Sequence, residues 1–388
     1  MKPAARTEAA IELLDEIIAA ARGGGAAADT LIARYFKERR YAGSHDRRAI
    51  RELVFRAVRR SGERPASGRS ALLGVAQDSP ELLDTFGAAG EAGDDAPAAA
   101  SVAPLWLLER FDPAISAGEQ AALLGRAPLD LRVNRLRGTR EAALALLPEA
   151  VPSPWSPLGL RLPEGFRVEQ AEAWRNGLVE IQDEGSQLIC LGCEAAPGMR
   201  VVDLCAGAGG KTLALAAEMD NRGQLVASDA DRGRLARMMP RLRRAGVRIV
   251  EPRLINPNRE TAMLADLAGQ ADLVLVDAPC SGTGTWRRNP ETRWRVTPAR
   301  LDRLSALQAR LLDIAAGLLA PGGRLVYAVC SLLAEEGRDQ AEALTRRSSL
   351  VPEPVAIPTG IASGPGLLLG PARDGTDGFF VARWKRPC

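Results

Sequence analysis

Hydrophobic positions recur at helical spacing through the first 85 residues of the chain. Residues 6–22 place apolar side chains on one face of a helix, at Ala10, Ile11, Leu14, Ile17, Ile18 and Ala21. Residues 46–60 repeat the pattern with Ile50, Leu53, Val54, Ala57 and Val58. We therefore expect an all-α N-terminal domain over residues 1–86.

The helical spacing is lost after this segment and a mixed pattern follows. Residues 87–103 are small residues, acids and a proline without an apolar stripe, which is typical of a linker. We expect linker and connecting helices to occupy residues 87–126. Over residues 127–178, the strand-like LDLRVNRL, a helix beginning at Thr139 and a proline-rich return predict a small α/β domain.

Short apolar runs alternate with helical patterns over residues 179–388. The runs are RVVDLC, QLVASD, VRIVE, DLVLVD and GRLVYAVC. Strands that are apolar on both faces and separated by helices predict a doubly wound, mainly parallel, Rossmann-like sheet. The expected architecture is therefore multidomain, with an all-α N-terminal domain and an α/β domain. Ligands of such sheets bind at the carboxyl ends of the strands.

Composition excludes several classes of function. The chain is 46% hydrophobic without a run of about 18 apolar residues, and its first residues include acids where a signal peptide is apolar, so we expect a cytoplasmic protein with no membrane partner. The single histidine, His45, is remote from the motifs below, which argues against Ser-His-Asp and Cys-His hydrolases. Cys190 and Cys193 form one CxxC without further zinc ligands, so we expect no metal.

The basic residues are nearly all arginine, with four lysines among the 51. Codon bias explains this usage without any function. Arginine also suits contacts with phosphates and bases, so a nucleic-acid partner is allowed.

A glycine turn follows the first strand of the α/β domain. The sequence VVDLCAGAGGKT places Gly207, Gly209 and Gly210 between a strand and a helix, where glycine lets a ligand approach the backbone. Asp229 ends the next strand, where an acid accepts hydrogen bonds from ribose hydroxyls. The third glycine of a dinucleotide fingerprint is missing, which favours S-adenosylmethionine over NAD as the cofactor.

Two cysteines end the fourth and fifth strand-like runs. Asp277 and Cys280 stand in ADLVLVDAPCSGTG, and Cys330 ends GRLVYAVC, so neighbouring parallel strands would bring both thiols to one edge of the sheet. Carbon 5 of cytosine is a weak nucleophile, but a thiolate that adds to carbon 6 activates it to attack a sulfonium methyl group. One cysteine can attack while the other assists release, and an acid is needed to hold the ring nitrogen.

These motifs resemble the Sun-type, RsmB-like family of RNA cytosine-5 methyltransferases. The similarity rests on DLCAGAGGKT, DAPCSGTGTWRRNPETRW, YAVCSLLAEEG and DGTDGFFVARW, and extends to VEIQDEGSQL, LDLRVNRLRGTREAALALL and YAGSHDRRAIRELVFRAVRR. It covers nearly the whole chain. It implies a NusB-like helical RNA-binding domain, a class I methyltransferase domain, and S-adenosylmethionine as the cofactor.

The resemblance also implies roles for single residues. Cys330 matches the nucleophile, Cys280 the cysteine that helps to release methylated RNA, and Asp277 the acid between cofactor and cytosine. The implied cofactor-binding residues are Cys205, Ala206, Gly207, Ala208, Gly209, Gly210, Lys211, Asp229 and Asp277, with Asn256 as the substitute for an adenine-facing Asp of the family. Candidate RNA-binding residues are Arg47, Arg48, Arg51, Arg287 and Arg288. Trp294 lies in the same basic and aromatic segment as Arg287 and Arg288, and it either contacts RNA or packs in the protein.

The leading hypothesis is a monomeric, S-adenosylmethionine-dependent RNA (cytosine-5-)-methyltransferase. It would act on small-subunit ribosomal RNA through a covalent cysteine adduct. The same reaction on transfer RNA or another RNA is one alternative. An RNA-binding or ribosome-assembly factor with degenerate catalysis is the other. Val329, in place of the usual Thr before the nucleophile, is one departure from the family pattern.

Overall fold

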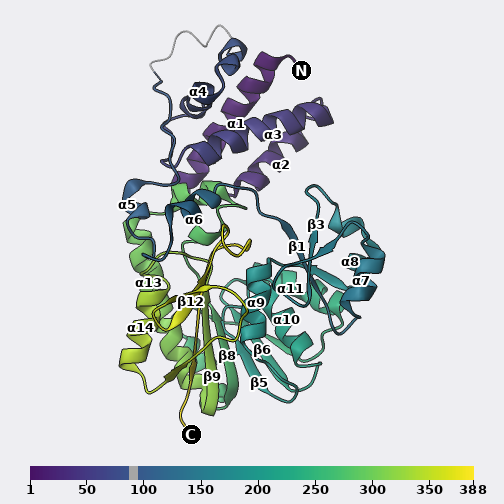
Figure 1. Cartoon of the computed structure of the whole chain (residues 1–388), viewed down its shortest axis with the longest axis vertical. Coiled ribbons are helices and arrows are strands. Elements are labelled where there is room, and N and C mark those ends of the chain that lie inside the picture. The colour runs from purple at the N-terminus through teal and green to yellow at the C-terminus, as the bar shows by residue number, and fades with distance from the viewer. Residues whose placement is uncertain (87–94) are drawn as a thin grey trace. The chain divides into compact units, whose positions relative to one another are not determined.

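The chain forms two compact units in the computed structural model, which describes residues 1–86 and 95–388. The first, here called the helical unit, comprises Met1–Phe111, Ile115–Arg126 and Thr285–Pro298. The second, the α/β unit, comprises Asp112–Ala114, Ala127–Gly284 and Ala299–Cys388. Figure 1 traces the chain through the elements of both units.

Amphipathic helices build the helical unit around one apolar core. They are α1 (Pro3–Gly23), α2 (Ala28–Glu38), α3 (Ser44–Arg60), α4 (Gly68–Asp78) and the 3-10 turn η1 (Pro80–Thr85). Helix α1 has a proline in its first turn, where no intrahelical donor is needed, and ends at Gly24 in the left-handed region. The two helices expected from the apolar spacing are present as α1 and α3, each beginning two or three residues earlier than predicted.

Part of the predicted linker belongs to the helical unit. Residues 87–94 of that prediction lie outside the described residues. Beyond them, the Ala98 amide donates to the Ser70 carbonyl at 2.9 Å, and Ser61 pairs with Ala100 in an isolated bridge. The short helices α5 (Leu105–Leu108) and α6 (Ala117–Ala122) follow.

The segment Thr285–Pro298, distant in sequence, is also part of the helical unit. It contains η6 (Pro290–Arg295), from which Trp294, 3% exposed, packs into the helical core and donates its indole N–H to the Ser61 carbonyl at 2.8 Å. Arg293 is fully buried and donates to the Arg59 carbonyl at 2.8 Å, and burial lowers its pKa to about 9. Of the two interpretations of Trp294, the structure supports packing.

The α/β unit begins with a small antiparallel sheet. Its strands are β1 (Leu129–Val133), β2 (Val151–Pro152), β3 (Gly159–Leu162) and β4 (Val179–Ile181), in the order β2-β3-β1-β4. Helices α7 (Arg140–Leu146) and α8 (Glu172–Arg175) accompany it, and the Thr139 hydroxyl caps α7 by accepting from the Ala142 amide. The predicted boundary at residue 178 falls one residue before β4, which pairs with β1.

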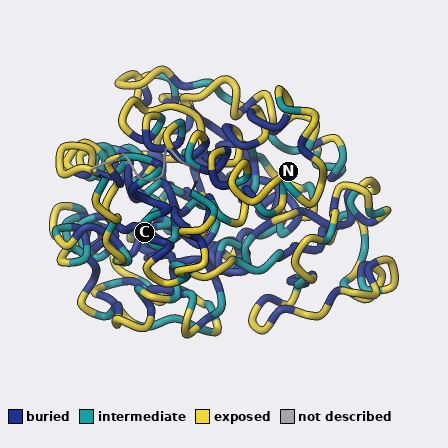
Figure 2. The backbone as a smooth tube through the Cα atoms, turned by 90° about the horizontal axis from the view of Figure 1, so that it is seen from above, coloured by how far each residue is buried: buried dark blue, intermediate teal, exposed yellow. Residues whose placement is uncertain are grey.

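Five parallel strands form one half of the main sheet, in the order β9-β8-β5-β6-β7. They are β5 (Arg200–Asp203), β6 (Gln224–Asp229), β7 (Val250–Leu254), β8 (Ala271–Asp277) and β9 (Leu319–Val329). Helices α9 (Glu184–Gly192), α10 (Gly210–Glu218) and α11 (Arg232–Ala245) lie on one side, and α13 (Pro298–Leu318) and α14 (Arg338–Arg347) on the other (Figure 1). Figure 2 colours the chain by residue burial, with buried residues in dark blue.

The other half of the main sheet is antiparallel. Strands β10 (Val351–Glu353), β11 (Ile361–Ser363), β12 (Gly366–Leu369) and β13 (Phe379–Lys385) follow β9, and β13 pairs with β9, β12 and β10. The prediction of a mainly parallel sheet is therefore wrong in this half, and the sheet is mixed. The chain returns from β12 to β13 without a crossover helix, so these two strands pair antiparallel, and β13 is also antiparallel to β9.

No helix in the described part of the chain is long and apolar enough to span a membrane.

Candidate functional site

Strands β8 and β9 bring two thiols together at the carboxyl edge of the main sheet. The strands are parallel neighbours, with Asp277 opposite Ala328. Cys280 lies three residues beyond the end of β8, and Cys330 follows β9 directly. Their sulfur atoms are 3.4 Å apart. This is the juxtaposition that the strand order predicts.

A buried carboxylate fixes the loop that carries Cys280. Glu336, which is 0% exposed, accepts a hydrogen bond from the Ser281 amide at 2.8 Å and another from the Ser281 hydroxyl. The Gln308 amide donates to both Glu336, at 3.1 Å, and the Pro279 carbonyl, at 2.9 Å. The backbone on both sides of Cys280 is therefore held from α13 and from the loop after β9.

Hydroxyl groups join the loops of the two cysteines. The Ser331 hydroxyl lies 3.2 Å from that of Ser281 and 3.1 Å from that of Thr283, and the Gly284 amide donates to the Cys330 carbonyl at 3.1 Å. Sequence reasoning missed this network. The available signal was the serine that directly follows each cysteine, in PCSGTG and VCSLL.

A charged pair of side chains lies beside the two thiols. Hydrogen bonding to Cys330 and burial raise the pKa of Cys280 well above its usual range. Lys211 donates to Asp277 at 2.7 Å beside them. Burial alone would lower the pKa of Lys211, but Asp277 and nearby thiols outweigh it and raise that pKa. An ion pair, with Lys211 as its cation, therefore lies close to the two thiols.

The glycine turn after β5 has the backbone geometry that its glycines allow. Gly207 and Gly209 have φ of 57° and 85°, in the left-handed region. The Gly207 amide donates to Asp229 at 2.7 Å, which ties the turn to the end of β6. A Cβ at Gly209 would approach the Met238 Cγ to 2.6 Å, so the turn packs closely against α11. The Ala206 amide donates to the Ser228 carbonyl at 2.9 Å, and the Ala208 carbonyl accepts from the Arg241 guanidinium at 2.7 Å.

A cavity of about 200 Å³ opens beside this turn, at the ends of β5, β6, β7 and β8. We call it the strand-end cavity. It is lined by Leu204, Cys205, Asp229, Ala230, Arg234, Ile255, Pro257, Glu260, Pro279, Leu307, Arg310 and Leu311. Each Asp229 oxygen accepts one backbone N–H and retains a lone pair, which suits the hydroxyls of a ribose. The glycine turn, this acid and the apolar walls fit S-adenosylmethionine.

Asn256 does not line the strand-end cavity. It is exposed, and its backbone amide points to the sulfur of Met263 at 3.3 Å. The neighbours Ile255 and Pro257 form the wall instead. The predicted adenine contact of Asn256 is therefore not supported, because the loop after β7 turns this side chain towards solvent.

The candidate RNA-binding arginines lie in two places in the helical unit. Arg47, Arg48 and Arg51 line one groove of about 570 Å³ along α2 and α3. Arg287 is 8% exposed and donates to the Arg126 carbonyl at 3.3 Å, whereas Arg288 is half-buried. Burial leaves Arg287 poorly placed to reach a phosphate.

Comparisons with known proteins agree with this geometry. A family model described as 16S rRNA methyltransferase RsmB/F matches residues 192–385. The ribosomal RNA small subunit methyltransferase B of Salmonella typhi is 36% identical over 290 residues, which cover 72% of this chain and 65% of the relative. The chain thus spans less than two thirds of that relative's length.

Two solved structures share the fold. PH0851 matches with a TM-score of 0.78 and 23% identity, over 100% of this chain and 99% of its own. A methyltransferase homolog protein from Pyrococcus horikoshii matches with a TM-score of 0.64 and 27% identity, over 72% of this chain and 94% of that chain.

The strand order, the glycine turn and the strand-end cavity define a class I methyltransferase fold. S-adenosylmethionine is the cofactor of this class. The family model matches half of the sequence, including both cysteine loops. The chain belongs to the RsmB/F family of 16S rRNA methyltransferases.

The carboxyl group of Asp203, at the end of β5, makes stability depend on pH. Burial raises its pKa to about 7, although a 2.6 Å hydrogen bond from the Thr212 hydroxyl opposes the shift. The folded protein therefore binds a proton between about pH 4 and 7 that the unfolded chain releases, and its stability falls as pH rises through that window. The slope for one proton is about 1.4 kcal/mol per pH unit.

Asp203→Asn should remove this dependence, since an amide stays neutral at every pH. We expect the unfolding free energy of the variant, relative to the parent, to rise from pH 5 to pH 7 and to level off above pH 8. Urea unfolding at each pH measures it. A difference that stays constant from pH 5 to pH 8 would contradict the raised pKa.

Glu336→Gln should destabilise the loop of Cys280. The amide nitrogen of glutamine cannot accept a hydrogen bond, so one Ser281 donor loses its partner, at a cost of about 1–3 kcal/mol. Glu342→Gln is the matched control, because its carboxylate lies on α14 in a partly exposed i,i+4 ion pair with Arg346, and we expect it to cost below about 0.5 kcal/mol. Urea unfolding compares the two variants, and equal costs would refute a role for Glu336 in holding the loop.

Proposed function

We propose that this protein transfers a methyl group from S-adenosylmethionine to carbon 5 of cytidine in RNA, with small-subunit ribosomal RNA as the substrate. The single observation that carries the proposal is the thiol pair, with sulfurs 3.4 Å apart beside Asp277 and Lys211. Transfer to an oxygen or an exocyclic amine needs no sulfur nucleophile. Methylation at carbon 5 of a pyrimidine does, because that carbon must first be activated from carbon 6.

The residues divide the reaction between them. Cys330, as the thiolate, adds to carbon 6, and the electron pair of the 5,6 double bond moves through carbon 4 to the ring nitrogen, which takes a proton from Asp277. S-adenosylmethionine supplies the methyl group to the activated carbon 5. The ring nitrogen returns its proton to Asp277. Loss of the carbon 5 proton to solvent then re-forms the 5,6 double bond and expels the Cys330 sulfur as a thiolate.

Cys280 completes this cycle as the group that releases the product. Its raised pKa keeps a proton on its sulfur, and that sulfur lies within hydrogen-bonding distance of Cys330. A donated hydrogen bond stabilises the departing thiolate, so the carbon–sulfur bond breaks more readily.

We further propose that the helical unit, as a NusB-like domain, binds the RNA backbone through its α2–α3 groove. Lys37 lines the same groove as Arg47, Arg48 and Arg51, so four cations surround one hollow with Phe36 in its wall. Arg51 is partly neutralised by Asp29 at 2.6 Å, which leaves three cations for phosphate contact.

The first experiment is nucleoside mass spectrometry. The protein is incubated with labelled S-adenosylmethionine and with unmodified ribosomal or transfer RNA. We expect labelled 5-methylcytidine in ribosomal RNA, and none with Cys330→Ala. Label in transfer RNA alone would move the substrate to that RNA. No label in either, beside an active control methyltransferase, would favour an RNA-binding or assembly factor.

The second experiment tests the division of labour between the cysteines. Cys280→Ala should still attack carbon 6 but release the product slowly, so a protein–RNA adduct should persist through denaturing electrophoresis. The double variant Cys280→Ala/Cys330→Ala should give no adduct. Cys388→Ala, which removes an exposed thiol, is the matched control and should behave as the parent. An adduct that survives in the double variant would refute Cys330 as the nucleophile.

A further inference from the structure

The base of the cofactor must point towards β7 in the strand-end cavity. The methyl group has to reach a cytosine held at Cys330, which lies at the end of β9. Asp229, the candidate ribose ligand, lies at the end of β6. In the strand order β9-β8-β5-β6-β7, this strand is on the opposite side of β8 from β9. A ligand laid across these strand ends therefore places its adenine near β7, between α12 (Glu260–Met263) and α13.

The walls at this end of the cavity suit a flat aromatic ring. Ile255 and Pro257 come from the loop after β7, and Leu307 and Leu311 come from α13. Apolar side chains of this kind can cover the faces of a purine, but they cannot recognise its amine. Recognition of the amine requires an acceptor at the edge of the ring.

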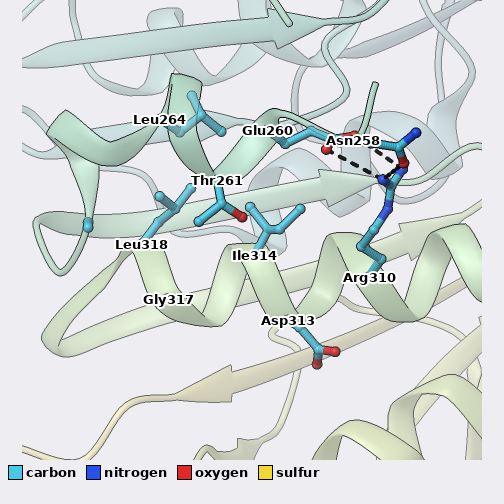
Figure 3. Close-up of a pocket in the computed structure, with 10 residues that line it drawn as sticks. Asn258, Glu260, Thr261, Leu264, Arg310, Asp313, Ile314, Gly317 and Leu318 are labelled. Carbon is cyan, nitrogen blue, oxygen red and sulfur yellow. Dashed lines mark hydrogen bonds and ion pairs between the residues drawn. The ribbon is translucent and has the colours of Figure 1, made fainter. Parts of the chain in front are cut away.

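Glu260 supplies the acceptor at this end. It is 9% exposed and lines the cavity, together with Arg310. The two side chains form a two-point ion pair, with Glu260 Oε1 at 3.1 Å from Arg310 Nη2 and Oε2 at 3.5 Å from Nη1. Arg310 also donates to the Asn258 side chain, so the guanidinium is held from two residues (Figure 3).

The same ion pair separates the cavity from a second hollow. Glu260 and Arg310 also line an outer groove of about 600 Å³ along α12 and α13, whose wall includes Thr261, Leu264 and Ile314 (Figure 3). They are the residues that the two hollows share. The pair therefore closes the adenine end of the cavity and presents one acceptor and one donor at that edge.

We propose that Glu260, oriented by Arg310, recognises the adenine amine of the cofactor in place of Asn256. The proposal rests on the proposed function, since it assumes S-adenosylmethionine in this cavity. The Glu260 carboxylate accepts from the exocyclic N–H, and the Arg310 guanidinium fixes the orientation of the carboxylate and is positioned to donate to the adjacent ring nitrogen. Adenine, with a donor beside an acceptor on this edge, is complementary to the pair.

The test compares two ligands that differ only at this edge. S-adenosylhomocysteine carries the amine, whereas S-inosylhomocysteine carries a carbonyl oxygen there, which a carboxylate repels. Isothermal titration calorimetry measures both dissociation constants on the full chain. We expect the parent to prefer the adenosyl ligand by about 10- to 100-fold, the range for a hydrogen bond to a charged group. Glu260→Gln should reduce this preference to about 1–3-fold, since a glutamine amide can accept from an amine or donate to a carbonyl.

Two controls separate recognition from a structural effect. Asn256→Ala should keep the parent's preference, and Glu260→Asp, which retains the charge, should bind the adenosyl ligand more weakly while still favouring it over the inosyl ligand. A parent-like preference in Glu260→Gln would overturn the proposal, as would loss of the preference in Asn256→Ala. A parent chain that binds neither ligand would overturn the cofactor assignment itself, and this proposal with it.

Discussion

The pairing of β8 with β9 is the constraint on which the candidate site depends. Two thiols can share a proton and a substrate only if their sulfurs stay within a few ångströms, and here the distance is 3.4 Å. Neither loop sets that distance alone. The parallel register fixes the two strand ends, and strand β13 holds the far side of β9, so Cys330 leaves a strand that is hydrogen-bonded on both edges. The antiparallel half of the sheet thus helps to fix the candidate site, because it holds β9.

The loop that carries Cys280 is held by a further restraint, the buried side chain of Glu336. Glu336 accepts from both the amide and the hydroxyl of Ser281, and Gln308 bridges it to the Pro279 carbonyl. A buried carboxylate is costly unless it is hydrogen-bonded, so this arrangement is stable only when the loop keeps its conformation. Because a change in the loop would break the hydrogen bonds of the buried Glu336 carboxylate, these bonds restrain the position of Cys280.

Much of this site could be predicted from the sequence because strand ends are local features. The alternation of apolar runs and helices predicts that Cys280, Cys330, Asp229 and the glycine turn lie at one edge of the sheet. The parts that could not be predicted depend on contacts between distant segments. Glu336 is an unremarkable acid in the sequence, and its role arises only from its approach to Ser281, 55 residues earlier.

The loop after β7 shows a different limit. The position of Asn256 in the chain suggested that it replaces an adenine-facing acid, but position in a motif does not fix the direction of a side chain. Ile255 is buried and Asn256 is exposed, because successive residues of an extended segment point to opposite sides. The acid that does reach the cavity, Glu260, comes from the following helix, where its spacing from β7 carries no recognisable signal.

The segment Thr285–Pro298 belongs to the helical unit although it lies far from the other residues of that unit in the sequence. Gly284 belongs to the α/β unit, where its amide donates to the Cys330 carbonyl and its carbonyl accepts from the Gly378 amide at 2.8 Å. One residue later the chain enters the helical unit, and Trp294 is buried in that unit's core. Burial of an indole of this size contributes several kcal/mol, about 3–5 kcal/mol by the cost of its truncation. The loop that carries Cys280 is therefore covalently continuous with a core residue of the helical unit, so one sequence motif contributes residues to both units.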